Sequence, residues 1–376
     1  MGKRILVTST DLMMIQFLVP HVINLSENGF EVEIACSVVG NRIEEVRQKL
    51  NGYVNAIHLV RLVRSPVSPT NFKGYKDMKK VINSGNYDII WTNEPVMGLT
   101  TRLAARKARK NGTKVFYMVH GFHFYKGAPK LNWLIYYPIE RFAAHFCDKL
   151  ITINNEDYKL ASKKFHCDVA RIHGIGVSAE CYHTISRDEK IQRLSAEGMS
   201  GDEFIVLCTG ELNENKDQKT LIAAAAKLKN KIPNLKVFLA GKGVLEEQLK
   251  AQVLELDLND VVKFLGYRKD LFSLTPAVNM VVSCSHREGM PRNILEAMLC
   301  KKPVVATENR GHNELVDNEI TGYLIKPGDS DTLAQKIYKI YSSKDDAVIM
   351  GNMGFKKVQS YTTSSVQNEF RNIFNF

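Results

Sequence analysis

Short apolar runs alternate with longer amphipathic segments along the whole chain. Segments such as 96–112 and 131–146 place apolar residues three and four apart, which predicts helices. Alternation of strands and helices is typical of βαβ units with parallel strands. The chain therefore predicts an α/β protein with two Rossmann-like, doubly wound parallel-sheet domains that face a cleft. The predicted strands lie at 4–8, 31–35, 55–60, 88–92, 114–119 and 149–153, and then at 204–210, 235–241, 261–266, 279–285, 302–307 and 321–325.

A glycine-containing segment at 172–182 separates the two sets of strands. We expect an N-terminal domain over 1–177, a C-terminal domain over 178–360, and a C-terminal helical segment over 361–376 that packs back on the N-terminal domain. A chain of 376 residues is long for one core, so two domains are also the expectation from length.

Composition narrows the class of protein. Hydrophobic residues make up 44% and charged residues 24% of the chain, which is typical of a soluble globular protein. No apolar run reaches the ~18 residues that a membrane span needs. The seven cysteines form no CxxC pair. This favours reduced, buried thiols in a cytosolic protein over a disulfide framework or a zinc site.

The net charge of +11 is concentrated in one half of the chain. Residues 1–177 hold 25 Lys and Arg against 14 Asp and Glu, a difference of +11, whereas the remainder holds 26 of each. A one-sided basic surface indicates an anionic partner for the N-terminal domain, such as membrane lipid or a phosphorylated acceptor. Nucleic acid is disfavoured because no recognised binding motif is present.

The stretch 280–302 predicts a buried strand, a tight loop and a helix that starts at Pro291. Ligands of open α/β sheets bind at this edge, and a helix N-terminus attracts anions. The free amides expected for a diphosphate are those of Gly289, Met290, Arg292 and Asn293. Glu288 precedes this anion cradle, and Glu296 lies about 7–8 Å along the helix from Pro291. In the alternative interpretation, Glu296 only forms a surface ion pair with Arg292, worth ~0.3–0.5 kcal/mol.

The segment REGMPRNILEAMLCKKPVVATENRGHNELVDNEITGYLIKPGD resembles the signature of the retaining glycosyltransferases of family four, which have the two-domain GT-B fold. The resemblance covers more than forty residues at high specificity and extends weakly over the whole chain. It implies that Glu296 binds the ribose hydroxyls of a nucleotide sugar, and we expect this sugar to be UDP-linked. It also implies that Glu288 lies against the transferred sugar.

Other donor-binding positions follow from the same resemblance. Lys216, in the turn after the first strand of the C-terminal domain, would grip the diphosphate as a cation beside developing negative charge. Gly210 and Gly241 would form close turns near the nucleotide. The family often has Arg after the first of these glycines, and here the residue is Glu211. One phosphate-binding cation is therefore missing, so Lys216 would act alone or with Arg292.

In the N-terminal domain, His120 follows a strand directly, and family members commonly place a histidine here that reaches the donor sugar across the cleft. His123 and Asp11 are weaker candidates for contact with the acceptor. Asp329 and Asp331 form a D-x-D sequence, which holds a metal in another transferase class. We expect a turn and a helix cap there instead, and we expect no metal and no cofactor beyond the nucleotide sugar.

The N-terminal domain also carries a candidate membrane surface. Residues 102–114 contain six cations, and residues 124–142 interleave Trp133, Tyr136 and Tyr137 with cations. These segments favour docking on anionic lipid, and a partly solvated helix is the alternative. The resemblance implies a hexosyl- or N-acetylhexosaminyltransferase for capsule or exopolysaccharide synthesis. It would act on a lipid-linked or oligosaccharide acceptor at the cytoplasmic face of the membrane. A nucleotide-sugar epimerase or hydrolase and a non-catalytic carbohydrate- or lipid-binding subunit remain open.

Overall fold

The computed structural model describes residues 2–39 and 43–376, apart from the side chains at 11–13 and 39. The chain divides into two compact units. The first contains Met1–Ile175 and Thr363–Phe376, and the second contains Gly176–Thr362. The chain therefore passes between the units twice. The first passage lies two residues before the boundary predicted after residue 177.

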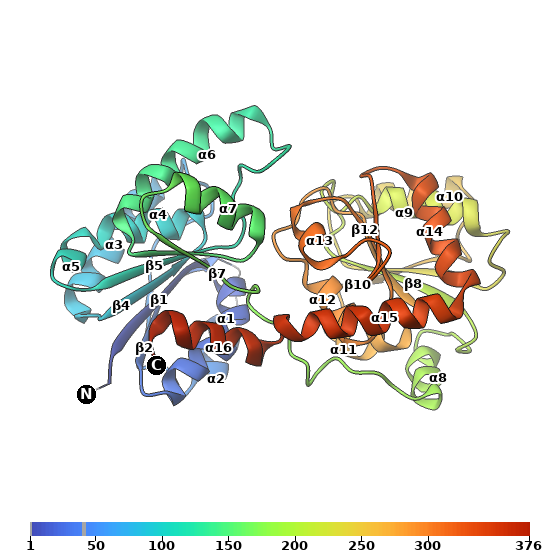
Figure 1. Cartoon of the computed structure of the whole chain (residues 1–376), viewed down its shortest axis with the longest axis horizontal. Coiled ribbons are helices and arrows are strands. Elements are labelled where there is room, and N and C mark those ends of the chain that lie inside the picture. Colours follow the sequence, from blue (N-terminus) through green and yellow to red (C-terminus); the bar gives the residue numbers. More distant parts are fainter. Residues whose placement is uncertain (1, 40–42) are drawn as a thin grey trace. The chain divides into compact units, whose positions relative to one another are not determined.

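The first unit is a parallel sheet of seven strands in the order β3-β2-β1-β4-β5-β6-β7 (Figure 1). Its strands are β1 (Arg4–Asp11), β2 (Glu31–Val39), β3 (Ala56–Leu59), β4 (Ile89–Asn93), β5 (Lys114–Val119), β6 (Lys149–Thr152) and β7 (Asp168–Arg171). Its helices are α1 (Leu12–Glu27), α2 (Ile43–Leu50), α3 (Thr70–Gly85), α4 (Pro95–Ala104), α5 (Arg106–Lys110), α6 (Lys130–Ala143), α7 (Asn155–Lys164) and α16 (Thr363–Phe374).

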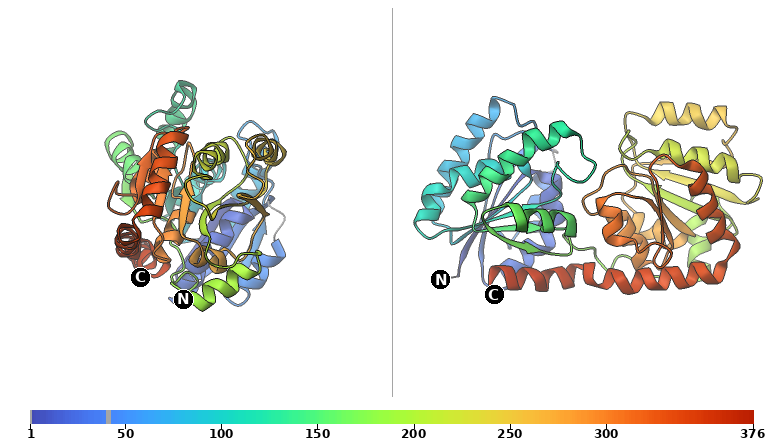
Figure 2. Two further views of the ribbon diagram at one scale, coloured as in Figure 1. Left: turned by 90° about the vertical axis from the view of Figure 1, so that its right-hand side faces the viewer. Right: turned by 45° about the horizontal axis from the view of Figure 1, so that its top comes forward.

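Helices cover both faces of this first sheet, as its buried strands require. Apolar residues of α3, α4 and α7 form one core with the strands. The C-terminal helix α16 packs on the sheet through aromatic rings, with Phe370 and Phe374 at 4.9 Å and 5.4 Å from the ring of Trp91. In Figure 2, α16 lies under the strands of its unit. Of the segment predicted over 361–376, residues 363–376 are therefore tied to the first unit by buried rings.

The second unit is a parallel sheet of six strands in the order β10-β9-β8-β11-β12-β13. Its strands are β8 (Phe204–Thr209), β9 (Leu235–Ala240), β10 (Val262–Gly266), β11 (Met280–Ser283), β12 (Val304–Thr307) and β13 (Tyr323–Ile325). Its helices are α8 (Arg187–Ser195), α9 (Gln218–Leu228), α10 (Glu246–Glu255), α11 (Leu271–Leu274), α12 (Arg292–Leu299), α13 (Arg310–Leu315), α14 (Ser330–Ser342) and α15 (Lys344–Val358).

Two apolar cores lie on opposite faces of this second sheet, one with α9, α10 and α14 and one with α8 and α12. The predicted fold class, two doubly wound parallel-sheet α/β domains, is confirmed. In each sheet the strand order reverses beside the first strand, between β1 and β4 and between β8 and β11. Ligands of such sheets bind at the carboxyl ends of strands at this switch point.

All twelve predicted strands are present, and the structure adds β7, which the sequence pattern missed. This strand has only four residues, Asp168–Arg171, and it lies at the edge of the sheet. Its exposed and half-buried residues give no apolar run. Helix α12 also begins one residue later than predicted, because Pro291 has extended backbone angles (φ −74°, ψ 108°) and precedes the first helical residue.

Candidate functional site

Two loops of the second unit leave the sheet at its switch point and are tied to each other. The first follows β8 and the second follows β11, and these strands are neighbours in the sheet. The amide of His286 donates to the carbonyl of Asn215 at 2.8 Å, and the Asn215 side chain donates to the carbonyl of Arg287 at 3.1 Å. These bonds fix the β8 loop, which carries Lys216, against the β11 loop, which carries Glu288.

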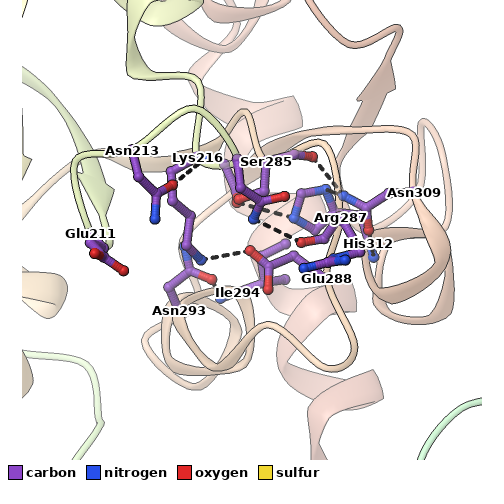
Figure 3. A network of polar contacts seen from close by, with 12 residues as sticks. Glu211, Asn213, Lys216, Ser285, Arg287, Glu288, Asn293, Ile294, Asn309 and His312 are labelled. Atoms are coloured by element: carbon purple, nitrogen blue, oxygen red, sulfur yellow. Dashed lines mark hydrogen bonds and ion pairs between the residues drawn. The ribbon is translucent and has the colours of Figure 1, made fainter. Parts of the chain in front are cut away.

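Lys216 and Glu288 form an ion pair at the centre of this arrangement (Figure 3). The Lys216 Nζ donates to Glu288 Oε1 at 2.6 Å, and the two side chains are only 24% and 15% exposed. The backbone amide of Lys216 also donates to Asn213 Oδ1 at 3.0 Å. Lys216 is therefore a positioned cation and not a solvated surface lysine. Glu211, which stands where the family often has arginine, is exposed and lies apart from the pair in Figure 3.

The start of α12 presents hydrogen-bond donors beside this ion pair. The amide of Ile294 donates to Asn293 Oδ1 at 3.0 Å, whereas the buried Nδ2 of Asn293 has no partner among the described residues. Figure 3 shows Asn293 next to Lys216 and Glu288. A buried amide group without a partner is costly, and the positive end of the helix dipole lies here. The arrangement can bind an anion with little rearrangement.

Close backbone packing explains two glycines in the adjoining turns. A Cβ atom on Gly241 would lie 1.8 Å from the carbonyl oxygen of Gly210, so this position admits no side chain. Gly210 itself has φ +147°, and its amide donates to the carbonyl of Ala240 at 3.0 Å. A Cβ there would lie 3.1 Å from the Lys216 side chain. Both glycines thus let the β8 loop, with its lysine, approach the turn after β9.

Helix α13 packs directly against Glu288. A Cβ on Gly311 would lie 2.8 Å from Glu288 Cβ and 3.0 Å from its carbonyl carbon and oxygen, so glycine allows the helix to touch Glu288 directly. The adjacent His312 is fully buried, and burial lowers its pKa to about 4 although Glu288 raises it. The neutral ring contacts the carbonyl of Thr307 through Nδ1 at 2.6 Å and Ser283 Oγ through Nε2 at 3.0 Å.

Glu296 lies within α12 and is 9% exposed. Its Oε1 is 3.8 Å from Arg292 Nε, so the ion pair of the alternative interpretation is present. It is not a solvated surface pair, however, because the carboxylate is buried. Burial raises the pKa of Glu296, while Arg292 and a hydrogen bond from Tyr182 lower it. A buried carboxylate with a hydroxyl partner can bind the hydroxyls of a ligand.

The first unit carries the other predicted residues. His120 Nε2 lies 3.0 Å from Asn93 Oδ1, and burial lowers the His120 pKa to about 4, so the ring is neutral at pH 7. His123 stacks on Tyr136, with 4.7 Å between ring centroids. Asp11 ends β1, and its side chain lies outside the described part of the structure. The sequence reasoning missed Glu94, which lies near His120 at the end of β4.

The D-x-D sequence has the structural role that was predicted for it. Asp329 caps α14, since its carboxylate accepts from the amide of Thr332 at 2.9 Å. Over residues 2–39 and 43–376, no group of three or more His, Cys, Asp or Glu side chains could hold a metal ion. The expectation that no metal is required stays a prediction.

At the candidate membrane surface, the residues that are exposed differ from those that were predicted. Trp133, Tyr136 and Tyr137 are half-buried and pack against the core of the first unit, and Arg102 is fully buried. Besides Lys130 and Arg141, helix α6 exposes five large apolar side chains: Leu131, Leu134, Ile135, Ile139 and Phe142. Their spacing of three and four places them on one face of the helix. None of the described helices has both the length and the apolar character needed to cross a membrane.

Two family models match the chain, one in each unit. The model of glycosyltransferase family 4 matches residues 21–176, and the model of glycosyl transferases group 1 matches residues 190–357. The chain is 38% identical to the putative glycosyltransferase EpsD of Bacillus subtilis over 377 residues, which cover 100% of this chain and 97% of that protein.

A second relative and a solved structure also match over nearly the full length. The Escherichia coli UDP-Gal:alpha-D-GlcNAc-diphosphoundecaprenol alpha-1,3-galactosyltransferase is 26% identical over 356 residues, covering 93% of this chain and 90% of that protein. The crystal structure of Anabaena Alr3699/HepE in complex with UDP has a TM-score of 0.81 at 20% identity and covers 99% of both chains. The latter similarity shows a shared fold.

Proposed function

The chain belongs to the glycosyltransferases of group 1 and family 4, which have the GT-B fold, and we propose that it moves a sugar from a UDP-sugar to a polyprenyl-diphosphate-linked glycan. We propose that the transfer retains the anomeric configuration and serves exopolysaccharide synthesis. The donor and acceptor are supported by the E. coli relative, whose name contains a UDP-sugar and a diphosphoundecaprenol-linked sugar. The role in polysaccharide synthesis is supported by a similarity of 26% over 176 residues to the capsular polysaccharide biosynthesis glycosyltransferase CapM of Staphylococcus aureus.

The observation that carries this proposal is the Lys216–Glu288 pair beside the unpartnered Asn293 amide. In the proposed reaction the bond between the anomeric carbon and the diphosphate oxygen breaks, and a bond to the acceptor oxygen forms on the same face. Lys216 and the amides at the start of α12 stabilise the negative charge on the leaving UDP. The acceptor's hydroxyl proton passes to the leaving phosphate oxygen.

Each carboxylate has a distinct place in this scheme. Glu288, whose cation partner would shift towards the diphosphate, contacts the transferred sugar and eases positive charge at its anomeric carbon. Glu296, farther along α12, accepts hydrogen bonds from the ribose hydroxyls. Burial of Glu296 makes this contact selective, since a buried carboxylate that has given up water favours a ligand that restores its hydrogen bonds.

The test compares two lysines of the same region. Lys216→Met removes the cation beside Glu288, whereas Lys219→Met removes an exposed lysine that pairs with Glu214 at 3.5 Å. Transfer is measured with UDP-glucose, UDP-galactose and UDP-N-acetylglucosamine, with GlcNAc-diphosphoundecaprenol as acceptor. We expect Lys216→Met to lower kcat by about 100-fold or more, and Lys219→Met to leave it unchanged. Equal activity of the two variants would contradict the assignment.

The same donors without acceptor separate this function from epimerisation and hydrolysis. A transferase leaves the UDP-sugar essentially intact under these conditions. Rapid inversion at C2 would indicate an epimerase, and rapid release of free sugar would indicate a hydrolase. Binding of donor without any turnover, with or without acceptor, would indicate a binding subunit.

We further propose that the exposed face of α6 docks on anionic lipid at the cytoplasmic side of the membrane. Lys130 and Arg141 lie on the same helix as the apolar residues, and such cations contribute about 1 kcal/mol each near an anionic surface. We expect salt-sensitive sedimentation with phosphatidylglycerol vesicles that is lost in Leu134→Ser/Ile139→Ser. The control is Phe72→Ser on α3, which changes an equally exposed apolar residue outside the proposed surface. Undiminished binding by the double variant, or no salt-sensitive binding at all, would refute the docking surface.

A further inference from the structure

Two cysteines lie side by side at the edge of the first sheet. Cys147 comes shortly before β6 and Cys167 directly before β7, and these two strands are parallel neighbours. The rings of His145 and His166, which precede the cysteines, have centroids only 5.2 Å apart. All seven cysteines of the chain are free thiols in the structure. The fold therefore brings together two thiols that are distant in the sequence.

The side chains of the two cysteines are in contact. The Cys167 thiol donates a hydrogen bond to Cys147 Sγ, and the Cys147 thiol donates to the carbonyl of Ala144 at 3.4 Å. Both side chains pack in the same apolar core. At the start of the strands, Lys149 Nζ lies 2.6 Å from Asp168 Oδ2, which holds the two segments together. Since a disulfide forms only where two cysteine side chains approach each other, this pair needs little movement to form one.

Two guanidinium groups, those of Arg102 and Arg109, lie near the pair. The hydrogen bond from Cys167 lowers the pKa of Cys147, and both arginines lower it further, although burial and Glu140 raise it. The same hydrogen bond raises the pKa of Cys167, so the pair releases one proton and retains the other. The thiolate is the reactive form of cysteine. Because Cys167 is half-buried, a small oxidant can reach the pair from its side.

Other cysteines of the chain provide internal references for this reactivity. Cys208, in β8, and Cys284, directly after β11, belong to one core of the second unit and are 4% and 1% exposed. Burial raises the pKa of Cys208 to about 12, and it also raises the pKa of Cys284. These two thiols therefore stay protonated. Cys181 is exposed and also belongs to the second unit, so it reports the reaction of an accessible thiol.

We propose that Cys147 and Cys167 are an oxidisable thiol pair, which hydrogen peroxide converts to a disulfide that ties the edge strand β7 to β6. The thiolate attacks one peroxide oxygen, the O–O bond breaks, and a sulfenic acid and a hydroxide ion form. The hydroxide ion takes up a proton to give water. The remaining thiol attacks the sulfenic sulfur, so the S–S bond forms and a second water leaves. In total the two thiols lose two electrons and two protons, and one peroxide molecule is reduced to two water molecules.

The test treats the full-length protein with hydrogen peroxide at pH 7, blocks the remaining thiols with N-ethylmaleimide and maps the peptides by mass spectrometry. We expect one dominant disulfide, between Cys147 and Cys167, which dithiothreitol reverses. Both thiols should disappear about tenfold faster than that of Cys181, because a cysteine of ordinary pKa is mostly protonated at this pH. Hydrogen exchange of the β7 amides, Asp168–Arg171, should become slower after oxidation, because the disulfide holds this short strand in place.

Two variants separate a specific pair from general oxidation. Cys167→Ser should abolish the disulfide and leave Cys147 as a sulfenic or sulfinic acid, whereas the control Cys181→Ser should form the same disulfide at the same rate. The proposal is wrong if Cys147 and Cys167 keep their thiols. It is also wrong if Cys208 and Cys284 react equally fast, because the peroxide would then be attacking an unfolded chain. The peptide map of the wild type decides between these outcomes even if Cys167→Ser does not fold. Equal exchange of the β7 amides before and after oxidation would overturn the tether of that strand.

Discussion

The buried ion pair between Arg102 and Glu140 makes a prediction for the stability of the first unit. Arg102, on α4, is fully buried, and its guanidinium donates to Glu140 Oε2 on α6 at 2.8 Å and to the carbonyl of Gly98 at 2.9 Å. It also lies 3.8 Å from the ring centroid of Tyr117, whose hydroxyl donates to Glu140 Oε1 at 3.0 Å. Burial lowers the pKa of Arg102, but Glu140 and the neighbouring Tyr117 and Cys147 together outweigh burial and raise the pKa overall.

The change Arg102→Met leaves Glu140 buried with its cation removed. At 2.8 Å and an effective dielectric constant of 20, the lost attraction is about 6 kcal/mol. Part of this is offset because methionine avoids the desolvation cost of the guanidinium. Breaking one side of a buried pair typically costs ~3–5 kcal/mol, and we expect that loss in the free energy of unfolding. Replacing both partners by Arg102→Met/Glu140→Met should recover most of it, because no uncompensated charge then remains.

The assay is urea denaturation followed by tryptophan fluorescence. Both tryptophans of the chain, Trp91 and Trp133, belong to the first unit, so the signal reports the unfolding of that unit alone. The control is Arg61→Met, which breaks a more exposed pair with Asp77 of similar length, 2.6 Å, and should not move the midpoint. The reasoning is refuted if Arg102→Met costs under about 1 kcal/mol, or if the double variant loses as much as the two single changes together.

Three further outcomes follow from the site. Gly311→Ala should lower kcat and cost ~1–3 kcal/mol of stability, because the new Cβ of residue 311 would clash with Glu288. Full activity would show that α13 moves away from Glu288 instead. Glu296→Gln should raise the KM for the UDP-sugar about tenfold and leave the acceptor KM unchanged, which steady-state kinetics measures. The free energy of unfolding should decrease as the pH is lowered from about 6.5 to 4. His312 and His120 titrate near 6.5 in the unfolded chain but near 4 in the folded protein, so unfolding takes up protons over this range. The loss of stability due to the fully buried His312 is at most roughly 3 kcal/mol, and the half-buried His120 adds less. Equal free energies of unfolding in urea denaturation at pH 7 and pH 4.5 would contradict this.

The strands, and the loop and helix at 284–299, could be predicted from the sequence because they depend on local patterns. Buried strands appear as apolar runs, and the loop and helix at 284–299 appear in the order of residues alone. Arg102 was assigned to a basic surface because its neighbours are cations, whereas its partner Glu140 lies 38 positions away in the sequence. Glu94 was missed because its positive φ leaves no trace in residue type and because its partners Ser9 and Thr10 lie 85 and 84 positions away in the sequence. What failed in each case was a contact between residues far apart in the chain.

The chemistry of the two switch points supports different ligands for the two units. At the β8–β11 switch point, Glu288 faces the charged Lys216 Nζ beside helix amides, which suits the negative charge of a diphosphate. At the β1–β4 switch point, the carboxylate of Glu94 is held by a neutral hydroxyl and an amide, and its neighbour His120 is neutral and accepting. A diphosphate at the β1–β4 switch point would meet the Glu94 carboxylate and a neutral His120, so its negative charge is better matched beside Lys216. The polarity of the side chains thus supports the proposal that the diphosphate of the donor binds to the second unit, beside Lys216.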